Sequence, residues 1–295
     1  MENQVRELYL DIIKRTILGI TYRDPSFNPS NASQNAFNKE TRENGEDWPV
    51  LAHTMVGLKR LDNIQQLLEK VFADDIPGDF IETGVWRGGA CIFANAIMKA
   101  YDEDRRVWVC DSFQGLPQPK AGEYPADRGD THWTAPYLSV SLEQVQQNFE
   151  GYNLLDGNLV FVKGWFSETL PLIPADSQFS ILRLDGDMYE STIVALENLY
   201  PKLSVGGYLI VDDYGLPNCR QALSDYREFH GITDEYIKID NSSVYWTKTK
   251  EIDADKVEHR FARPVDPTAP VSVPGLDLSS PAPLKKEMTT QISNS

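Results

Sequence analysis

The chain has 295 residues, of which 41% are hydrophobic and 11% aromatic, and a formal net charge of −16. This length and composition allow a substantial core in one large or two small domains. The acidic surface repels phosphate backbones and anionic lipids, which disfavours nucleic-acid and membrane partners. The three cysteines form no metal-binding spacing, and the N-terminus has no signal-peptide pattern. We therefore expect a cytoplasmic protein with reduced thiols.

Two helices are predicted in the N-terminal region, residues 1–76. Apolar residues recur at helical spacing up to Thr21, and "AHTMVGLKRLDNIQQLLEKVF" predicts a second helix over 52–72 with Met55 on its apolar side. The apolar positions of the first helix are Val5, Leu8, Tyr9, Ile12, Ile13, Leu18 and Ile20. The polar, turn-rich segment 23–49 between the helices is interpreted as a long ordered or semi-ordered loop.

From residue 77 to 250, short apolar runs alternate with helical segments. This alternation predicts an α/β fold with a doubly wound, mostly parallel sheet. The last two runs, "YIKID" and "SVYWTK", can pair as a hairpin and place an antiparallel strand at the sheet edge. The tail, residues 262–295, holds six of the eighteen prolines and no aromatic residue, and we predict that it is disordered.

The stretch "IETGVWRGG", residues 81–89, predicts a strand, a glycine turn and the start of a helix. Gly84 permits a tight turn, and Gly88 and Gly89 would let a ligand approach the helix N-terminus. The pattern differs from the dinucleotide fingerprint, and Glu82 would repel a pyrophosphate but not a sulfonium or an amino group. The alternative is an ordinary glycine-rich turn between a strand and a helix.

The next strand, "VWVCD", ends on Asp111. A carboxylate at this place can accept both ribose hydroxyls of a bound nucleoside, although Asp and Ser are also common helix caps. Gly84 and Asp111 together predict a nucleoside site across the carboxyl ends of two adjacent strands.

Two further strands end in acidic residues, "LDGDMYEST" after one and "IVDDYG" after the other. In a parallel sheet both ends lie at the same edge, so Asp185, Asp212 and Asp213 can converge. Close carboxylates repel one another unless positive charge lies between them, and their hard oxygens favour Mg²⁺ or Ca²⁺ over zinc. Asp187 would be a base or support a metal ligand. The alternative is that these acids are turn and cap residues.

The sequence resembles the macrocin O-methyltransferase (TylF/NovP-like) family of class I S-adenosylmethionine-dependent methyltransferases. The matching blocks span about residues 4–249 and leave the tail outside. They are "DWPVLAHTMVGLKRLDNIQ", "FIETGVWRGGACIFA", "VCDSFQGLP", "LDGDMYEST", "LYPKLSVGGYLIVDDYG" and "CRQALSDYR". The resemblance implies methylation of sugar hydroxyls on natural products, with S-adenosylmethionine and Mg²⁺ as cofactors.

The resemblance also implies roles for particular residues. The cofactor's amino-acid end would lie at Glu82, Thr83 and Gly84, its ribose at Asp111 and Ser112, and its adenine near Gly164 and Trp165 or Phe166. Thr54 and Met55, in the helix before the sheet, would cover the cofactor, and Gly88 would line its site. Mg²⁺ would bind Asp185, Asp212 and Asp213. Many family members have an acidic residue before the Gly-Trp/Phe element, where this chain has Lys163.

Segment 122–141 would form a lid over the substrate and carries His132, a candidate base, although lone histidines in loops are more often plain surface residues. Residues 1–76 would shape the acceptor pocket and the contacts of a homo-oligomer. The resulting hypothesis is a Mg²⁺-dependent O-methyltransferase acting on a sugar hydroxyl, with Asp185 or Asp187 as the base. The alternatives are a small-phenol or catechol-type O-methyltransferase and a non-catalytic protein that binds S-adenosylmethionine.

Overall fold

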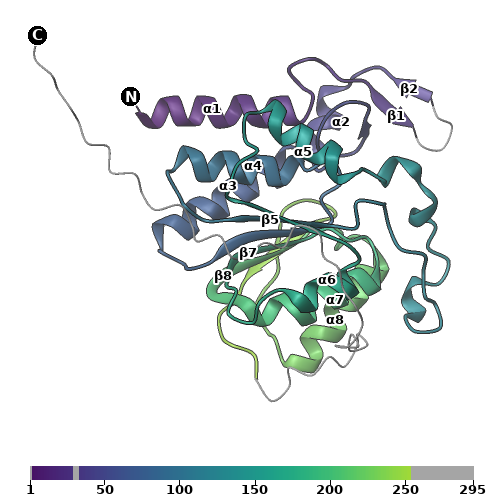
Figure 1. The fold of residues 1–295 in the computed structure, drawn as a ribbon. Coiled ribbons are helices and arrows are strands. Elements are labelled where there is room, and N and C mark those ends of the chain that lie inside the picture. The colour runs from purple at the N-terminus through teal and green to yellow at the C-terminus, as the bar shows by residue number, and fades with distance from the viewer. Residues whose placement is uncertain (1, 29–32, 254–295) are drawn as a thin grey trace, which may run out of the picture.

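The computed structural model describes residues 2–28 and 33–253 and has a seven-stranded sheet at its centre (Figure 1). The strand order is β6-β5-β4-β7-β8-β10-β9, in which β4 to β8 are parallel and β10 and β9 antiparallel. The strands are β4 (Asp79–Thr83), β5 (Val107–Asp111), β6 (Leu159–Lys163), β7 (Phe179–Leu184), β8 (Leu203–Val211), β9 (Ile237–Lys238) and β10 (Val244–Thr247). This confirms the predicted fold class. The predicted disorder of 262–295 lies outside the described residues.

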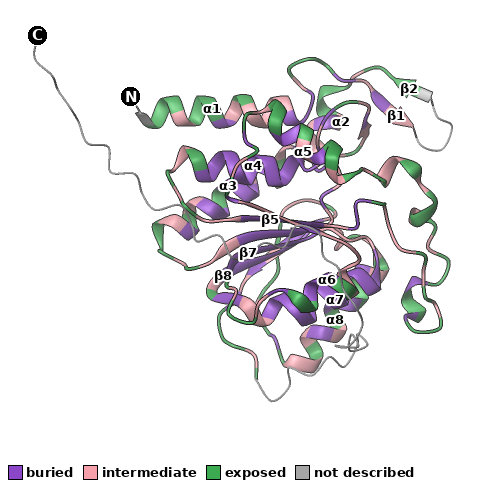
Figure 2. Ribbon diagram, in the orientation of Figure 1, coloured by how far each residue is buried: buried purple, intermediate pink, exposed green. Residues whose placement is uncertain are grey.

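Helices cover both faces of the sheet (Figure 1). One layer contains α1 (Glu2–Ile17), α3 (Gly57–Ala73), α4 (Gly89–Ala100) and α5 (Leu142–Gly151), and the other contains α6 (Phe166–Thr169), α7 (Tyr189–Leu199) and α8 (Pro217–His230). Each layer has its own apolar core against the sheet. Figure 2 shows that the sheet and the helix sides that face it are buried. The N-terminal helices therefore share a core with the sheet.

The winding of the chain fixes where a ligand can bind. From β4 the chain proceeds to β5 and β6 on one side, and then returns to β7 and β8 on the other side of β4. The connections leave β4 and β7 in opposite directions, so a crevice forms outside their carboxyl ends.

The polar segment 23–49 is more structured than its composition suggested. It contains β1 (Ser26–Asn28), β2 (Ser33–Asn35), α2 (Lys39–Asn44) and β3 (Trp48–Pro49), and these strands form a small sheet. The fully buried Arg42 pairs with Asp47 at 2.8 Å and donates to the carbonyl of Leu18 at 2.8 Å. One buried guanidinium thus orders a region that has few apolar side chains.

Three details of the predicted helices are wrong. The first helix ends at Ile17, and it buries Leu10 and Ile17 against its neighbours while Leu8 is 63% exposed. Val5 and Ile12, also on the predicted apolar face, are exposed as well. The second helix begins at Gly57, so Met55 precedes it. Ile13, Leu18 and Ile20 of the predicted set do pack against the core, so apolar spacing identified only part of the side that faces α4.

We expect the two leucines of α1 to differ strongly in their contribution to stability. Leu10→Ala removes a side chain with no exposure and should lower the free energy of unfolding by about 2–5 kcal/mol. Leu8→Ala, the matched control, should change it by less than about 0.5 kcal/mol. Urea unfolding followed by circular dichroism measures both, and equal losses would contradict this packing.

Candidate active site

A cavity of about 890 Å³ lies at the carboxyl ends of the parallel strands. Its walls include residues that follow β4, β5, β6, β7 and β8, the segment before α3, and the lid, 122–141. Among the residues selected from the sequence, those that line it are Thr54, Met55, Glu82, Gly84, Asp111, Ser112, His132, Gly164, Trp165, Phe166, Asp185, Asp187, Asp212 and Asp213. The fold thus gathers residues from five strand ends into one cavity.

Thr83 and Gly88 were also selected from the sequence, but they are not among the described residues that line the cavity. The carbonyl of Thr83 accepts a hydrogen bond from the Asp185 amide at 2.9 Å, which ties the ends of β4 and β7 together. Gly88 caps α4, and a Cβ there would lie 2.9 Å from Val145 Cγ1. Gly88 therefore lets α4 pack against α5, and the structure does not place it among the cavity-lining residues that it describes.

Glycine is required at position 84 because the backbone of Asp185 passes very close to it. Its φ is +88°, and a Cβ built on it would lie 1.7 Å from the carbonyl oxygen of Asp185. Both the positive φ and the contact exclude a side chain. Absence of a side chain at Gly84 therefore brings Asp185 to the floor of the cavity.

We expect Gly84→Ala to lower the free energy of unfolding by at least about 2 kcal/mol, because strain and overpacking add. Gly122→Ala is the control, since a Cβ there meets no described atom within 4 Å. Chemical denaturation compares the two variants. If Gly84→Ala lowers the free energy of unfolding no more than Gly122→Ala does, β4 and β7 separate freely, which would contradict this close approach.

Asp111 links the turn after β4 to the turn after β5. Its carboxylate accepts hydrogen bonds from the amides of Val85 at 2.8 Å and Phe113 at 2.7 Å, and burial raises its pKa. The neighbouring Ser112 hydroxyl donates to the carbonyl of Gly115 at 2.6 Å. Asp111 also lines the cavity, so its carboxylate is available to hydroxyl groups of a ligand.

The acids after β7 and β8 converge. Asp185, Asp212 and Asp213 each offer a carboxylate oxygen, and these oxygens all lie within 4.8 Å of one another. Asp213 also accepts a hydrogen bond from the amide of Asp187 at 3.0 Å, and Asp187 has a φ of +58°. The parallel topology thus produces the acidic cluster that the sequence indicated.

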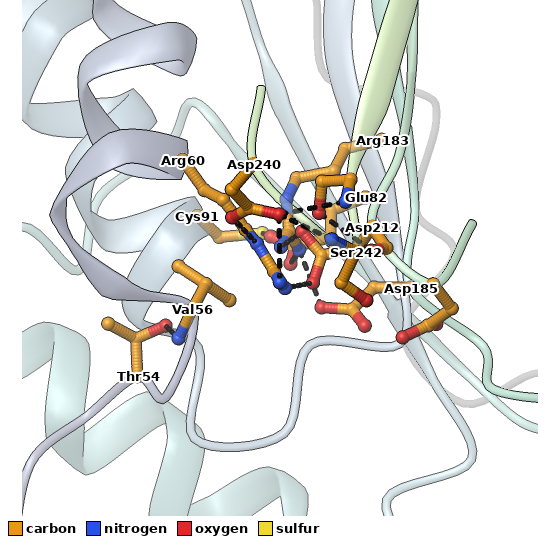
Figure 3. A network of polar contacts seen from close by, with 12 residues as sticks. Thr54, Val56, Arg60, Glu82, Cys91, Arg183, Asp185, Asp212, Asp240 and Ser242 are labelled. Atoms are coloured by element: carbon orange, nitrogen blue, oxygen red, sulfur yellow. Dashed lines mark hydrogen bonds and ion pairs between the residues drawn. The ribbon is translucent and has the colours of Figure 1, made fainter. Parts of the chain in front are cut away.

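Two arginines lie beside this cluster, and sequence reasoning missed both. Arg183, in β7, pairs with Glu82, Asp212 and, at 2.8 Å, with Asp185. Arg60, in α3, pairs with the other oxygen of Asp212 and with Asp240 at 2.7 Å (Figure 3). An arginine inside the apolar run "FSILRL" was the available signal, because a buried guanidinium requires acidic partners.

The site nevertheless has more acidic groups than basic groups. Five carboxylates, those of Glu82, Asp185, Asp187, Asp212 and Asp213, surround two guanidinium groups. Burial raises the pKa of Glu82 to about 7, although Arg183 acts in the opposite direction. Burial and the charge of Asp212 raise the pKa of Asp185 to about 6, and burial and the charge of Asp185 raise that of Asp187 to about 7.

The pKa values of these carboxyl groups depend on the positive charge near them. A bound cation would lower them, since nearby positive charge favours the ionised carboxylates. The Asp185 side chain is 23% exposed, so water in the cavity also reduces the effect of burial on this residue. The excess of carboxylates is the property that would attract a cation.

His132 lines the cavity from the lid. Its Nδ1 lies 3.0 Å from Asp130 Oδ2; partial burial opposes protonation, but Asp130 and the charge of Asp187 raise its pKa overall. The lid is attached to the cavity wall through Asp127, whose carboxylate accepts the amides of Tyr189 at 2.7 Å and Glu190 at 3.0 Å. The lid is therefore fixed to the N-terminus of α7.

Aromatic side chains close the side of the cavity near the N-terminal region. Trp48, in β3, and Trp86, after β4, both line it. Tyr137 of the lid stacks on Trp48 with ring centroids 4.8 Å apart and accepts a hydrogen bond from Trp86 Nε1 at its carbonyl, at 2.9 Å. The lid and the small N-terminal sheet thus meet in one aromatic cluster.

In the part of the chain that the structure describes, every helix is too short or too polar to cross a bilayer.

Comparison with solved structures places the fold among the class I methyltransferases. The structure of the O-methyltransferase NovP is 48% identical with a TM-score of 0.79, and the match covers 83% of this chain and all of that one. The structure of the calicheamicin methyltransferase CalS11 has a TM-score of 0.53 at 23% identity, over 64% of this chain and 79% of that one, and supports the fold alone.

The sequence comparison is more specific. A family model described as Macrocin-O-methyltransferase (TylF) matches residues 6–248. Mycinamicin III 3''-O-methyltransferase of Micromonospora griseorubida is 48% identical over 82% of this chain and 97% of its own. Demethyldecarbamoylnovobiocin O-methyltransferase of Streptomyces niveus is also 48% identical, over 84% and 96%. The chain belongs to the macrocin O-methyltransferase family of class I S-adenosylmethionine-dependent methyltransferases, and it is an O-methyltransferase.

Proposed function

We propose that the protein methylates a hydroxyl group of a sugar on a natural product and that it uses Mg²⁺. The observation that carries this proposal is the convergence of Asp185, Asp212 and Asp213 inside the cavity. The names of similar proteins support the acceptor class: one of them, from Streptomyces olivaceus, acts on a rhamnosyl-tetracenomycin C and is 48% identical over 84% of this chain and 95% of its own.

The three carboxylates fit a magnesium ion. Mg–O distances are about 2.0–2.1 Å, so two oxygens on one ion lie at most about 4.2 Å apart. The ligand oxygens here lie within 4.8 Å, and small side-chain rotations bring them into range. The oxygens of Asp185 and Asp212 that accept from arginines keep a second lone pair. Bound Mg²⁺ would lower the pKa of a substrate hydroxyl and help to orient it.

The cofactor is proposed to lie along the strand ends. Glu82 and Gly84 would hold its amino-acid end, Asp111 and Ser112 its ribose, and Trp165 and Phe166 its adenine. Thr54 and Met55, which line the cavity just before α3, would cover it. This order follows the wall of the cavity from β4 to β6, because these strands are adjacent.

In the reaction the acceptor oxygen attacks the sulfonium methyl group, and the products are a methyl ether and the neutral thioether of S-adenosylhomocysteine. Asp185 or Asp187 would accept the proton that the hydroxyl loses. His132 would keep the acidic side of the cavity closed, and it is a second candidate for this proton. Much of the rate would come from alignment of oxygen, methyl and sulfur in a closed site.

We expect turnover of S-adenosylmethionine and a glycoside panel to stop in a chelator and to return with Mg²⁺. Asp213→Asn should lose at least about 100-fold in kcat, whereas Asp176→Asn, an exposed acid outside the cavity lining, should keep full activity. Methyl transfer is measured by mass spectrometry. Full turnover in the chelator would remove the metal from the mechanism.

We further expect the aromatic wall to contact the acceptor, because sugars present apolar C–H faces. Trp48→Ala should raise the KM for the glycoside by about tenfold, equivalent to about 1.4 kcal/mol, and leave the KM for S-adenosylmethionine within about twofold. Trp133→Ala is the control, since Trp133 is 40% exposed in the lid and outside the described lining. A rise confined to the KM of the cofactor would contradict this placement.

A further inference from the structure

Glu190, in the first turn of α7, carries a buried carboxylate that the proposed reaction does not use. It is 5% exposed, and its Oε1 accepts a hydrogen bond from Lys120 Nζ at 2.5 Å. Its Oε2 is buried and has no hydrogen-bond partner among the described residues. Both residues line the cavity. An unpaired buried carboxylate oxygen is costly, so its presence in a cavity wall points to a ligand that donates a hydrogen bond.

The position of Glu190 identifies the end of the cavity that it serves. A Cβ on Gly186 would lie 2.8 Å from Ser191 Cβ and 3.5 Å from Phe166 Cε2, so the first turn of α7 and the Phe166 ring flank the same glycine. Helices α6 and α7 also pack together. The first turn of α7, which carries Glu190, therefore lies beside Phe166, on the side of the cavity where Trp165 and Phe166 would receive the adenine.

The other wall at this end supplies one further acid, Glu168 of α6, which lines the cavity but is exposed, whereas the Glu190 carboxylate is buried. Lys163, the last residue of β6, precedes Gly164 and is not among the described lining residues. Adenine donates hydrogen bonds at this edge only through its 6-amino group. A carboxylate whose second oxygen is free fits such a donor, and the hydrogen bond from Lys120 holds that carboxylate in position.

We propose that Glu190 Oε2 accepts a hydrogen bond from the 6-amino group of the cofactor's adenine, and that Lys120 is its positioning residue. This inference rests on the proposed placement of the adenine beside Trp165 and Phe166. It makes Glu190 the residue that selects adenine over a 6-oxopurine, because the carboxylate would face a carbonyl oxygen in hypoxanthine and repel it.

The test compares S-adenosylhomocysteine with S-inosylhomocysteine, its 6-oxo analogue, by calorimetric titration without an acceptor. The wild type should bind the adenine compound at least about 30-fold more tightly. Glu190→Gln should reduce this preference to below about fivefold, since an amide can donate to the 6-oxo group. Lys120→Met should reduce it at least about threefold. Glu150→Gln, an exposed residue of α5, should leave it unchanged.

An unchanged base preference in Glu190→Gln, together with a higher KM for the acceptor, would overturn the inference and assign Glu190 to the acceptor. Melting curves show whether Glu190→Gln folds. If it does not, Lys120→Met provides the test, and an unchanged preference of Lys120→Met for the adenine compound overturns the inference. Failure of the wild type to bind either nucleoside would instead reject the proposed cofactor placement, so the two failures are distinguishable.

Discussion

The structure of the site depends on one buried ion-pair network centred on Arg183. Its guanidinium group binds carboxylates from three adjacent strands: Glu82 at the end of β4, Asp185 after β7 and Asp212 after β8. Glu82 and Arg183 are register partners in the sheet, so backbone pairing already places them side by side. Without this positive charge, burial of three carboxylates together would be very costly.

The network also sets the balance of charge available for chemistry. Arg60 extends it from α3, so the helix that precedes the sheet is tied to the acid after β8. The two guanidinium groups neutralise only part of the cluster. The Asp213 carboxylate accepts a hydrogen bond from the amide of Asp187, and neither Asp187 nor Asp213 forms an ion pair with a lysine or arginine among the described residues. A cavity that is fixed by arginines yet remains acidic is suited to a divalent cation.

The fold and the convergence of the acids could be predicted because both follow from a regular rule. Strands that alternate with helices form a parallel sheet, and the carboxyl ends of parallel strands meet at one edge. The roles of Arg183 and Arg60 could not be predicted from the sequence, because residue spacing does not reveal which acid a distant basic side chain contacts. The hydrogen bond from the Val85 amide to the Asp111 carboxylate depends on turn geometry that the motif does not encode. The packed side of α1 depends on α4, a distant partner.

The most direct test of the central claim is calorimetric titration of Mg²⁺ into the protein saturated with S-adenosylhomocysteine. We expect one ion to bind per chain in the wild type and none to bind after Asp212→Asn, because that change removes a ligand charge while both arginines remain. Absence of binding to the wild type, or equal binding to both proteins, would contradict the claim that this arginine-held acidic cluster is a cation site.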